Sequence, residues 1–389
     1  MANRPTILII DDEPFNVDYL EQELEDLDYD TVSASNGQEG LQRVAETKPD
    51  MILLDIMMPV MDGFEMLGKL KAEPEWRDIP VVIISAMSDM DSVVRGIQLG
   101  ADDYLPKPSD PVLLKARLEA GLARKRLRDL EKRYIQSLEK ELDIGHRIQS
   151  GFLPDSLPEI DGWGIAAHFK AAREVAGDFY DVFCLPNGQV GFFLGDVTDK
   201  GVGSALFMAL YRSLLRAFFL DDLPGNDPIM GDKYARLLLH IVRRTNQYVS
   251  ETHESPLFAT LFIGILDPET GTIRYINAGQ NPPAILKPDN SRIDLKPTGS
   301  FIGMASDLEY KVAEAELREG EALFIYSDGV EDTENDAGEF FGRECMIELL
   351  ATPPQSAAEL VERFSSTLES FMGEAKPFDD VTVLVMMKE

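Results

Sequence analysis

Short apolar runs alternate with segments of helical periodicity over residues 1–124, and this alternation restricts the possible folds more than any other feature. Five runs have the length and composition of strands: 6–10, 30–34, 51–54, 81–85 and 102–105. The segments between them repeat apolar residues every three or four positions, as helices do. Alternating strands and helices predict an α/β domain with a doubly wound, five-stranded parallel sheet.

A long polar helix is predicted from about residue 112 to residue 150, and residues 125–152 of this region form a linker. Apolar residues recur on it at spacings of three or four: Leu127, Leu130, Tyr134, Leu138 and Leu142. A narrow apolar stripe between charged faces is typical of a coiled coil, or of a helix that docks on a neighbouring domain. The spacing is not a strict heptad. We expect the linker to mediate a homodimer.

Residues 153–389 show a different pattern, in which neighbouring strands are joined by tight turns and interrupted by blocks of helix. The expected strands are 163–171, 177–185, 189–197, 258–266, 272–278, 322–327 and 381–387. The expected helices are 202–219, 233–250, 343–350 and 356–372. The turn signals at 187–188 and 267–271 favour antiparallel hairpins. This region is therefore predicted to be an α+β domain built on antiparallel sheets.

The charge and the cysteine content exclude several classes of function. Asp and Glu total 69 and Lys and Arg total 37, giving a net charge of −32, which argues against nucleic acid or an anionic membrane as a partner. The two cysteines, Cys184 and Cys345, form no CxxC motif, which argues against a disulfide framework or a zinc site. No stretch approaches the roughly 18 apolar residues of a membrane span, and the N-terminus lacks a signal-peptide pattern. We expect a cytoplasmic protein.

Polar side chains stand where the first five strands end. Asp11 and Asp12 follow the first strand, Asp55 the third, Ser85 ends the fourth and Lys107 follows the fifth. The carboxyl ends of parallel strands meet at one edge, so these side chains should converge. Three carboxylates suit Mg²⁺, and a hydroxyl with an ammonium can hold phosphate oxygens.

These residues lie in segments that resemble the response-regulator receiver domain over residues 5–124: 10–13, 54–59, 62–63, 84–86 and 104–108. The resemblance implies that Asp55 accepts a phosphoryl group from a sensor histidine kinase. It implies that Ser85 and Lys107 bind the phosphoryl group and that Tyr104 is the aromatic switch residue. The implied Mg²⁺ ligands are Asp11, Asp12, Asp55 and the backbone carbonyl of Met57.

Four aspartates of the C-terminal region stand in apolar or glycine-rich segments. They are Asp178, Asp196, Asp328 and Asp379, in the segments 176–181, 195–201, 326–330 and 378–382. An unpaired buried carboxylate is costly, so such groups pair with cations or coordinate metal. The four segments together predict a metalloenzyme.

In this order the segments resemble the metal-dependent serine/threonine phosphatases of the 2C type, in their bacterial SpoIIE/RsbU-like branch, over residues 146–389. Other matching segments are 148–149, 153–154, 259–262, 277–279, 282–283 and 338–342. The resemblance implies two packed antiparallel sheets flanked by helices. It also implies two Mn²⁺ or Mg²⁺ ions, which activate a water for attack on phosphoserine or phosphothreonine.

The resemblance assigns a role to each aspartate. Asp196 bridges the two ions, and the carbonyl of Val197 joins it. Asp328 and Asp379 complete the ligands of the second ion, whereas Asp178 holds the first ion mainly through its waters.

Two assignments stay open. Either Asp379 or its neighbour Asp380 is the ligand, and the family pattern favours the first. Arg173 is either a phosphate-gripping arginine of the active site or a surface arginine. Three positions depart from the family pattern, namely Ala176 for glycine, Thr198-Asp199-Lys200 for Ser-Gly-His and Gln280 for histidine. None of them removes a metal carboxylate.

The leading hypothesis is a protein phosphatase controlled by phosphorylation of Asp55, with a phosphorylated STAS-type anti-sigma-factor antagonist as the substrate that the resemblance implies. The alternative is a catalytically silent adaptor, in which the receiver controls a docking surface for a sigma factor or an anti-sigma partner. A pure adaptor has no physical need for four placed carboxylates, which favours the enzyme. The sequence leaves open the kinase, the substrate protein, the preferred metal and the direction of control.

Overall fold

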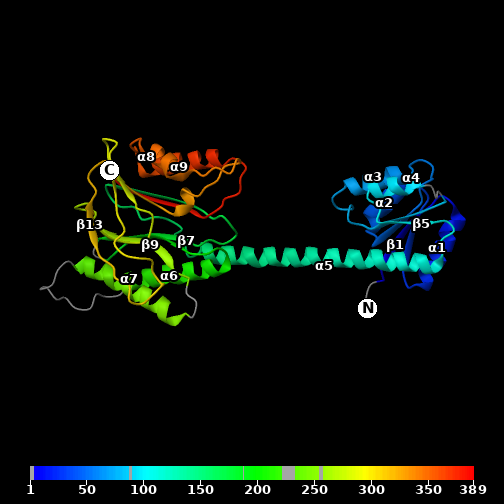
Figure 1. Cartoon of the computed structure of the whole chain (residues 1–389), viewed down its shortest axis with the longest axis horizontal. Helices are drawn as coiled ribbons and strands as arrows, with labels where there is room; N and C mark the ends of the chain where they lie inside the picture. Colours follow the sequence, from blue (N-terminus) through cyan, green and yellow to red (C-terminus); the bar gives the residue numbers. More distant parts are fainter. Residues whose placement is uncertain (1–3, 87–89, 187, 221–232, 254–256) are drawn as a thin grey trace. The chain divides into compact units, whose positions relative to one another are not determined.

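The computed structural model describes the whole chain except residues 1–3, 87–89, 187, 221–232 and 254–256. The chain divides into two compact units, Met1–Leu138 and Glu139–Glu389, and Figure 1 shows the elements of each. The division falls inside one long helix, α5, whereas the sequence predicted limits at 124 and 152. Those domain limits therefore stay a prediction.

The first unit contains the predicted five-stranded parallel sheet, with strand order β2-β1-β3-β4-β5. Its strands are β1 (Thr6–Ile10), β2 (Asp30–Ala34), β3 (Met51–Leu54), β4 (Val81–Ser85) and β5 (Asp103–Pro106). Its helices are α1 (Pro14–Asp26), α2 (Gly37–Thr47), α3 (Gly63–Ala72), α4 (Met90–Gln98) and the start of α5 (Pro111–Ser150). The fifth strand begins one residue later than predicted, and the carboxylate of the preceding Asp102 accepts a hydrogen bond from the N–H of Val81. Apolar clusters cover both faces of the sheet.

Helix α5 confirms the predicted long helix. Its first turns bury Leu114, Leu118 and Leu122 against the receiver sheet. Farther along, Leu127 and Tyr134 are 68% and 66% exposed. The predicted apolar stripe is thus on the surface of the helix.

The second unit confirms the predicted pair of antiparallel sheets, with strand orders β13-β10-β9-β8-β7 and β12-β11-β14-β15-β6. The strands of the first sheet are β7 (Asp178–Cys184), β8 (Val190–Val197), β9 (Ala259–Leu266), β10 (Thr272–Ala278) and β13 (Ala313–Glu316). Those of the second are β6 (Trp163–Lys170), β11 (Ala284–Leu286), β12 (Arg292–Asp294), β14 (Ala322–Tyr326) and β15 (Val381–Lys388). The sheets share an apolar core that includes Phe192, Phe262 and Leu384.

Helices cover the outer face of each sheet. Against the first sheet pack α6 (Val202–Leu220) and α7 (Lys233–Thr252). Against the second pack α8 (Gly342–Leu350) and α9 (Ala357–Met372), on the opposite side of the unit (Figure 1). The resulting four layers bury two helix–sheet cores and one sheet–sheet core.

Two sequence expectations need correction. Strands β11, β12 and β13 were not predicted, because each has only three or four residues and cannot show a clear alternation. Helix α6 is long and apolar enough to cross a membrane by length and composition, contrary to the expectation that no stretch approaches this length. One such helix is weak evidence of a membrane span, and its Met208, Tyr211 and Leu215 are buried against the first sheet.

The sequence also predicted a hairpin turn at residues 187–188, of which Asn187 lies outside the described residues.

Candidate functional site

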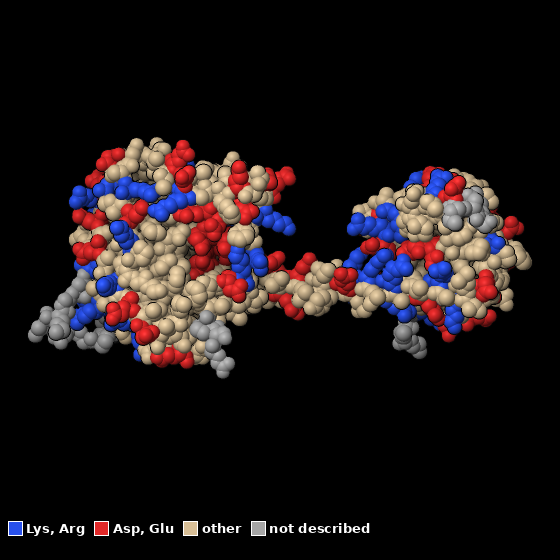
Figure 2. All heavy atoms as spheres, in the orientation of Figure 1, with Lys and Arg blue, Asp and Glu red and all other residues tan. Residues whose placement is uncertain are grey.

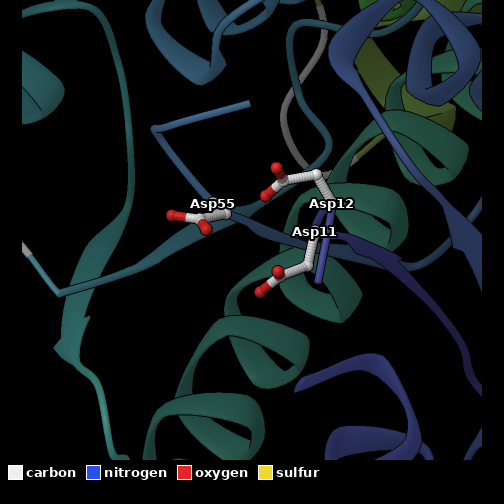
Figure 3. A group of neighbouring side chains, drawn as sticks. All are labelled: Asp11, Asp12 and Asp55. Carbon is white, nitrogen blue, oxygen red and sulfur yellow. The ribbon is translucent and has the colours of Figure 1, made fainter. Parts of the chain in front are cut away.

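Asp11, Asp12 and Asp55 come together at the carboxyl edge of the parallel sheet (Figure 3). Asp11 and Asp12 follow β1, and Asp55 follows β3, which lies next to β1. Each offers a carboxylate oxygen within 4.8 Å of the other two. Oxygen ligands at this spacing fit Mg²⁺. Met57, the other residue for which a ligand role was predicted, lies two positions after Asp55 and has an exposed side chain.

Lys107 closes this site from the end of β5. Its ammonium donates to Asp11 at 2.6 Å and to Asp55 at 2.5 Å. Burial alone would lower the pKa of Lys107, but the hydrogen bonds to the two carboxylates outweigh burial and raise it. The ammonium therefore stays charged where a phosphoryl group on Asp55 would carry its negative oxygens.

The two remaining receiver residues lie beside each other. Ser85 is buried at the end of β4, and the hydroxyl of Tyr104 donates to its backbone carbonyl at 3.3 Å. Gly63 begins α3 so close to Asp55 that an added Cβ would lie 2.1 Å from the carbonyl oxygen of Asp55. Only glycine permits this approach.

The four aspartates of the second unit come from the ends of two strand pairs. Asp178 and Asp196 face each other in register on β7 and β8. Asp328 follows β14 and begins a short 3-10 helix, Asp328–Val330. Asp379 precedes β15, the neighbour of β14. Figure 2 shows Asp and Glu side chains gathered on one face of this unit, with Lys and Arg side chains beside them.

These carboxylates disfavour one another's charge. The pKa of Asp196 is raised to about 8, mainly by burial and in second place by the charges of Asp328 and Asp379. The pKa of Asp178 is raised well above its usual range, mainly by burial and in second place by the charges of Asp196 and Asp380. The pKa of Asp328 is raised to about 6 by burial and by the charge of Asp379, although the residue reaches solvent. Divalent cations would relieve this repulsion, so the chemistry of the donor set fits a metal centre. Among the described residues, however, no three of these carboxylates have oxygens within 4.8 Å of one another.

Asp379 and Asp380 differ in what they bind. The buried carboxylate of Asp380 accepts hydrogen bonds from the N–H groups of Ala172 at 2.8 Å and Gly177 at 2.6 Å. It is therefore committed to holding the loop that leads into β7. Asp379 is partly open to solvent and faces the ammonium of Lys200 at 2.9 Å. The geometry favours Asp379 as the ligand, which is the choice the sequence could not make.

Close packing and hydroxyl groups hold the backbone of the site. A Cβ on Gly177 would lie 2.4 Å from the hydroxyl of Ser204 and 2.8 Å from the carbonyl of Val197. That carbonyl, for which a metal contact was predicted, accepts a hydrogen bond from Ser204 at 3.2 Å and has a second lone pair available. On the other side, the hydroxyl of Thr382 donates to Asp178.

Arg173 is not part of the carboxylate cluster. It is exposed on the loop before β7, and it forms no ion pair with any residue that the structure describes. Three residues to which the sequence assigned no contact do touch the site or its loop: Gln149, Lys200 and Thr382. All three lie in segments quoted above, but nothing in the pattern indicates their contacts.

Gln280 lies behind the site and illustrates one departure from the family pattern. Its side-chain amide donates to the carbonyl of Tyr326 at 2.8 Å, and its side-chain oxygen accepts from the hydroxyl of Thr260. Both polar groups of the buried Gln280 side chain thus have hydrogen-bond partners other than the four aspartates.

Comparison with known proteins agrees with this geometry. The family described as "Stage II sporulation protein E (SpoIIE)" matches residues 186–388, just over half of the chain, and the family described as "Response regulator receiver domain" matches residues 7–119. The chain therefore belongs to the SpoIIE family and carries an N-terminal receiver domain. It therefore combines a receiver domain and a SpoIIE domain in one chain.

Individual relatives resemble one or both parts. Protein IcfG of Synechocystis sp. is 37% identical over 262 residues, which cover 64% of this chain and 41% of IcfG. Response regulator PleD of Caulobacter vibrioides is 39% identical over 158 residues, 41% of this chain and 33% of PleD. The chain thus matches less than half the length of these curated relatives. The SiaA-PP2C domain of Pseudomonas aeruginosa shares the fold, with a TM-score of 0.54 and 21% identity over 66% of this chain and 99% of that one.

Proposed function

We propose that the chain is a phosphorylation-controlled protein serine/threonine phosphatase. The observation that carries this proposal is the set of four aspartates at the strand ends of the second unit, among which burial and neighbouring carboxylates raise the pKa values of Asp178, Asp196 and Asp328. These carboxylates do not stabilise the fold, because their mutual repulsion lowers the stability of the folded state. A catalytically silent adaptor does not need it either.

In this proposal Asp196, Asp328 and Asp379 would hold two Mn²⁺ or Mg²⁺ ions together with the carbonyl of Val197, and Asp178 would act mainly through metal-bound water. The ions would supply a hydroxide and neutralise charge on the phosphoryl oxygens of phosphoserine or phosphothreonine. The protein fixes the ligands: β7 and β8 hold Asp178 and Asp196 in register. Thr382 orients the carboxylate of Asp178 by a hydrogen bond.

The other site residues have supporting roles. Asp380 shapes the loop before β7 through its two backbone hydrogen bonds. Arg173 projects from that same loop into solvent, where it is accessible to the phosphate of an incoming substrate. We keep it as a candidate for substrate binding only.

The receiver supplies the control. A sensor histidine kinase would phosphorylate Asp55 with Mg²⁺ bound by Asp11, Asp12 and the Met57 carbonyl. Lys107 would then exchange part of its contact with Asp55 for the phosphoryl oxygens. Ser85 would donate to the same group, and Tyr104, already joined to Ser85, would follow its movement.

The end of α5 is the physical connection to the metal site. The side chain of Gln149 is buried and makes two hydrogen bonds with the backbone of Ala176: its amide donates to the carbonyl at 2.6 Å, and its oxygen accepts from the N–H at 2.9 Å. One turn earlier, the ring Nδ1 of His146 lies 2.7 Å from the carbonyl of Glu174. Ala176 is two residues from Asp178, so rotation or shift of α5 would displace a metal ligand.

We further propose a phosphorylated STAS-type anti-sigma-factor antagonist as the substrate, a cytoplasmic location and a homodimer formed through α5. The exposed apolar residues Leu127, Leu130 and Tyr134 support the dimer. The net charge supports a protein substrate in preference to nucleic acid.

The test is release of phosphate from a phosphoserine protein substrate with millimolar Mn²⁺, compared with excess chelator. Wild-type protein should release phosphate only with the metal, and Asp328→Asn should lose this activity while keeping its circular dichroism spectrum. Asp161→Asn, an exposed carboxylate before β6, serves as the matched control and should retain activity. Metal-independent release, or full activity in Asp328→Asn, would refute the assignment.

A further inference from the structure

Lys200 brings a positive charge into the carboxylate cluster. It lies in the loop between β8 and α6, and its ammonium is 2.9 Å from a carboxylate oxygen of Asp379. The same ammonium donates to the backbone carbonyl of Phe378 at 2.7 Å and lies 4.0 Å from the centre of the Phe378 ring. These three contacts hold the Lys200 side chain against Asp379, whereas the ammonium of a solvated surface lysine mainly contacts water.

The charge of Lys200 acts beyond this one contact. It lowers the pKa values of Asp328 and Asp332, both of which burial and other carboxylates raise. Lys200 is therefore a counter-ion for the part of the cluster where Asp328 and Asp379 lie.

The arrangement of the carboxylates fits this role. Among the residues that the structure describes, only Asp11, Asp12 and Asp55 form a set of three acidic or metal-binding groups with all ligand atoms within 4.8 Å. No three of the carboxylates in the second unit reach this spacing. One oxygen of Asp379 faces the ammonium of Lys200 and the other accepts a hydrogen bond from the N–H of Asp380 at 2.9 Å, so a cation that binds Asp379 shares this carboxylate with a positive charge.

We propose that Lys200 competes with a divalent cation for Asp379 and thereby weakens metal binding at the phosphatase site. The inference rests on the proposed function, because it takes Asp379 as a ligand. A lysine suits this role, because its ammonium is a compact point charge on a flexible stem that can withdraw. After leaving Asp379, the ammonium of Lys200 would remain beside the carboxylate cluster, within reach of other negatively charged groups.

The backbone around Lys200 supports a fixed approach to the cluster. Asp199 has a φ of 75° and Gly201 a φ of 92°, both in the left-handed region that most residues avoid. The Asp199 carboxylate accepts a hydrogen bond from the N–H of Lys200 at 2.8 Å. The loop thus holds Lys200 in a defined turn directly after β8, which ends one residue after Asp196.

The experiment is calorimetric titration of Mn²⁺ into the full-length protein, in an Asp12→Asn background that disables the receiver metal site. Lys200→Gln should bind Mn²⁺ about tenfold more tightly than the parent, because a positive charge in contact with a ligand is lost. Lys200→Arg, which keeps the charge, should bind like the parent. Lys296→Gln, an exposed lysine between β12 and β13, makes the same change in net charge and should have no effect.

Equal or weaker Mn²⁺ binding by Lys200→Gln would overturn the inference. A further pair of titrations separates this failure from failure of the proposed function. If Asp196→Asn and Asp328→Asn both retain the Mn²⁺ binding of the parent, the metal site itself is wrongly assigned. If both lose it while Lys200→Gln leaves it unchanged, the metal site stands and only the competition by Lys200 is refuted.

Discussion

Replacing Asp196 by asparagine should destroy catalysis and yet stabilise the fold when no divalent cation is present. The reason is the environment that raises the pKa of Asp196 from 3.8 to about 8. The folded chain then binds a proton that the unfolded chain releases, so stability falls as the pH rises from about 4 to about 8. Each pKa unit corresponds to about 1.4 kcal/mol, which sets a ceiling of about 4 kcal/mol near neutral pH.

The expected effect is smaller than this ceiling. Asp196 is partly accessible to water, and its neighbours Asp328 and Asp379 can shift away, so we expect about 2 kcal/mol near neutral pH. For a domain of this size that is a rise of about 4–8 °C in Tm. Asparagine is neutral at every pH, so the difference from the wild type should approach zero near pH 4 and increase as the pH rises towards about 8.

The assay is thermal unfolding in excess chelator at a series of pH values, repeated with Mn²⁺. With Mn²⁺ the wild type should have the higher Tm, because metal binding to the folded state stabilises the wild type and not Asp196→Asn. Asp161→Asn is the control for loss of an exposed carboxylate. Equal Tm values of wild type and Asp196→Asn at all pH values in chelator would show that the carboxylates do not repel one another as the structure indicates.

Three other changes test separate parts of the account. Asp55→Ala should abolish labelling by a small phosphodonor such as acetyl phosphate, seen as loss of a phosphate-retarded band on electrophoresis; persistent labelling would show another phosphoacceptor. Gln149→Leu removes both hydrogen bonds to Ala176 and should change the basal rate of phosphate release severalfold while leaving Asp55 labelling intact; an unaltered rate would exclude this contact as the connection. Asp380→Asn can keep at most one of two strong N–H contacts and should lower stability by about 1–3 kcal/mol in chelator, measured by urea unfolding, whereas Asp379→Asn should not.

The sequence predicted the long elements well because their patterns are local. Strands β1 to β4 match their predicted limits; β1, β3 and β4 are mainly apolar runs next to a polar residue, whereas β2 mixes polar and apolar residues. Strands β11 to β13 are too short for such a pattern, and their pairing depends on neighbours far along the chain. Helix α6 is apolar on more than its packed face: Met208, Tyr211 and Leu215 are buried against the first sheet, whereas Leu206 and Leu220 are exposed.

The candidate site was predicted by residue type and order, but its internal contacts were not. Asp379 and Asp380 are adjacent and chemically identical, and only the positions of the Ala172 and Gly177 N–H groups distinguish them. Lys200 appeared in the sequence only as a departure from a family pattern. Its contact joins residues separated by 179 positions along the chain, which periodicity and local motifs cannot show.

We propose that phosphorylation of Asp55 controls a metal-dependent phosphatase in the same chain. This can be tested by the rate of Mn²⁺-dependent hydrolysis of a generic aryl phosphate and of a phosphoserine protein substrate, with and without beryllofluoride as a mimic of phospho-Asp55. We expect hydrolysis that chelation abolishes and that beryllofluoride alters in the wild type but not in Asp55→Ala. Absence of hydrolysis with every metal would contradict the enzyme, and hydrolysis of both substrates that is indifferent to beryllofluoride would contradict the control.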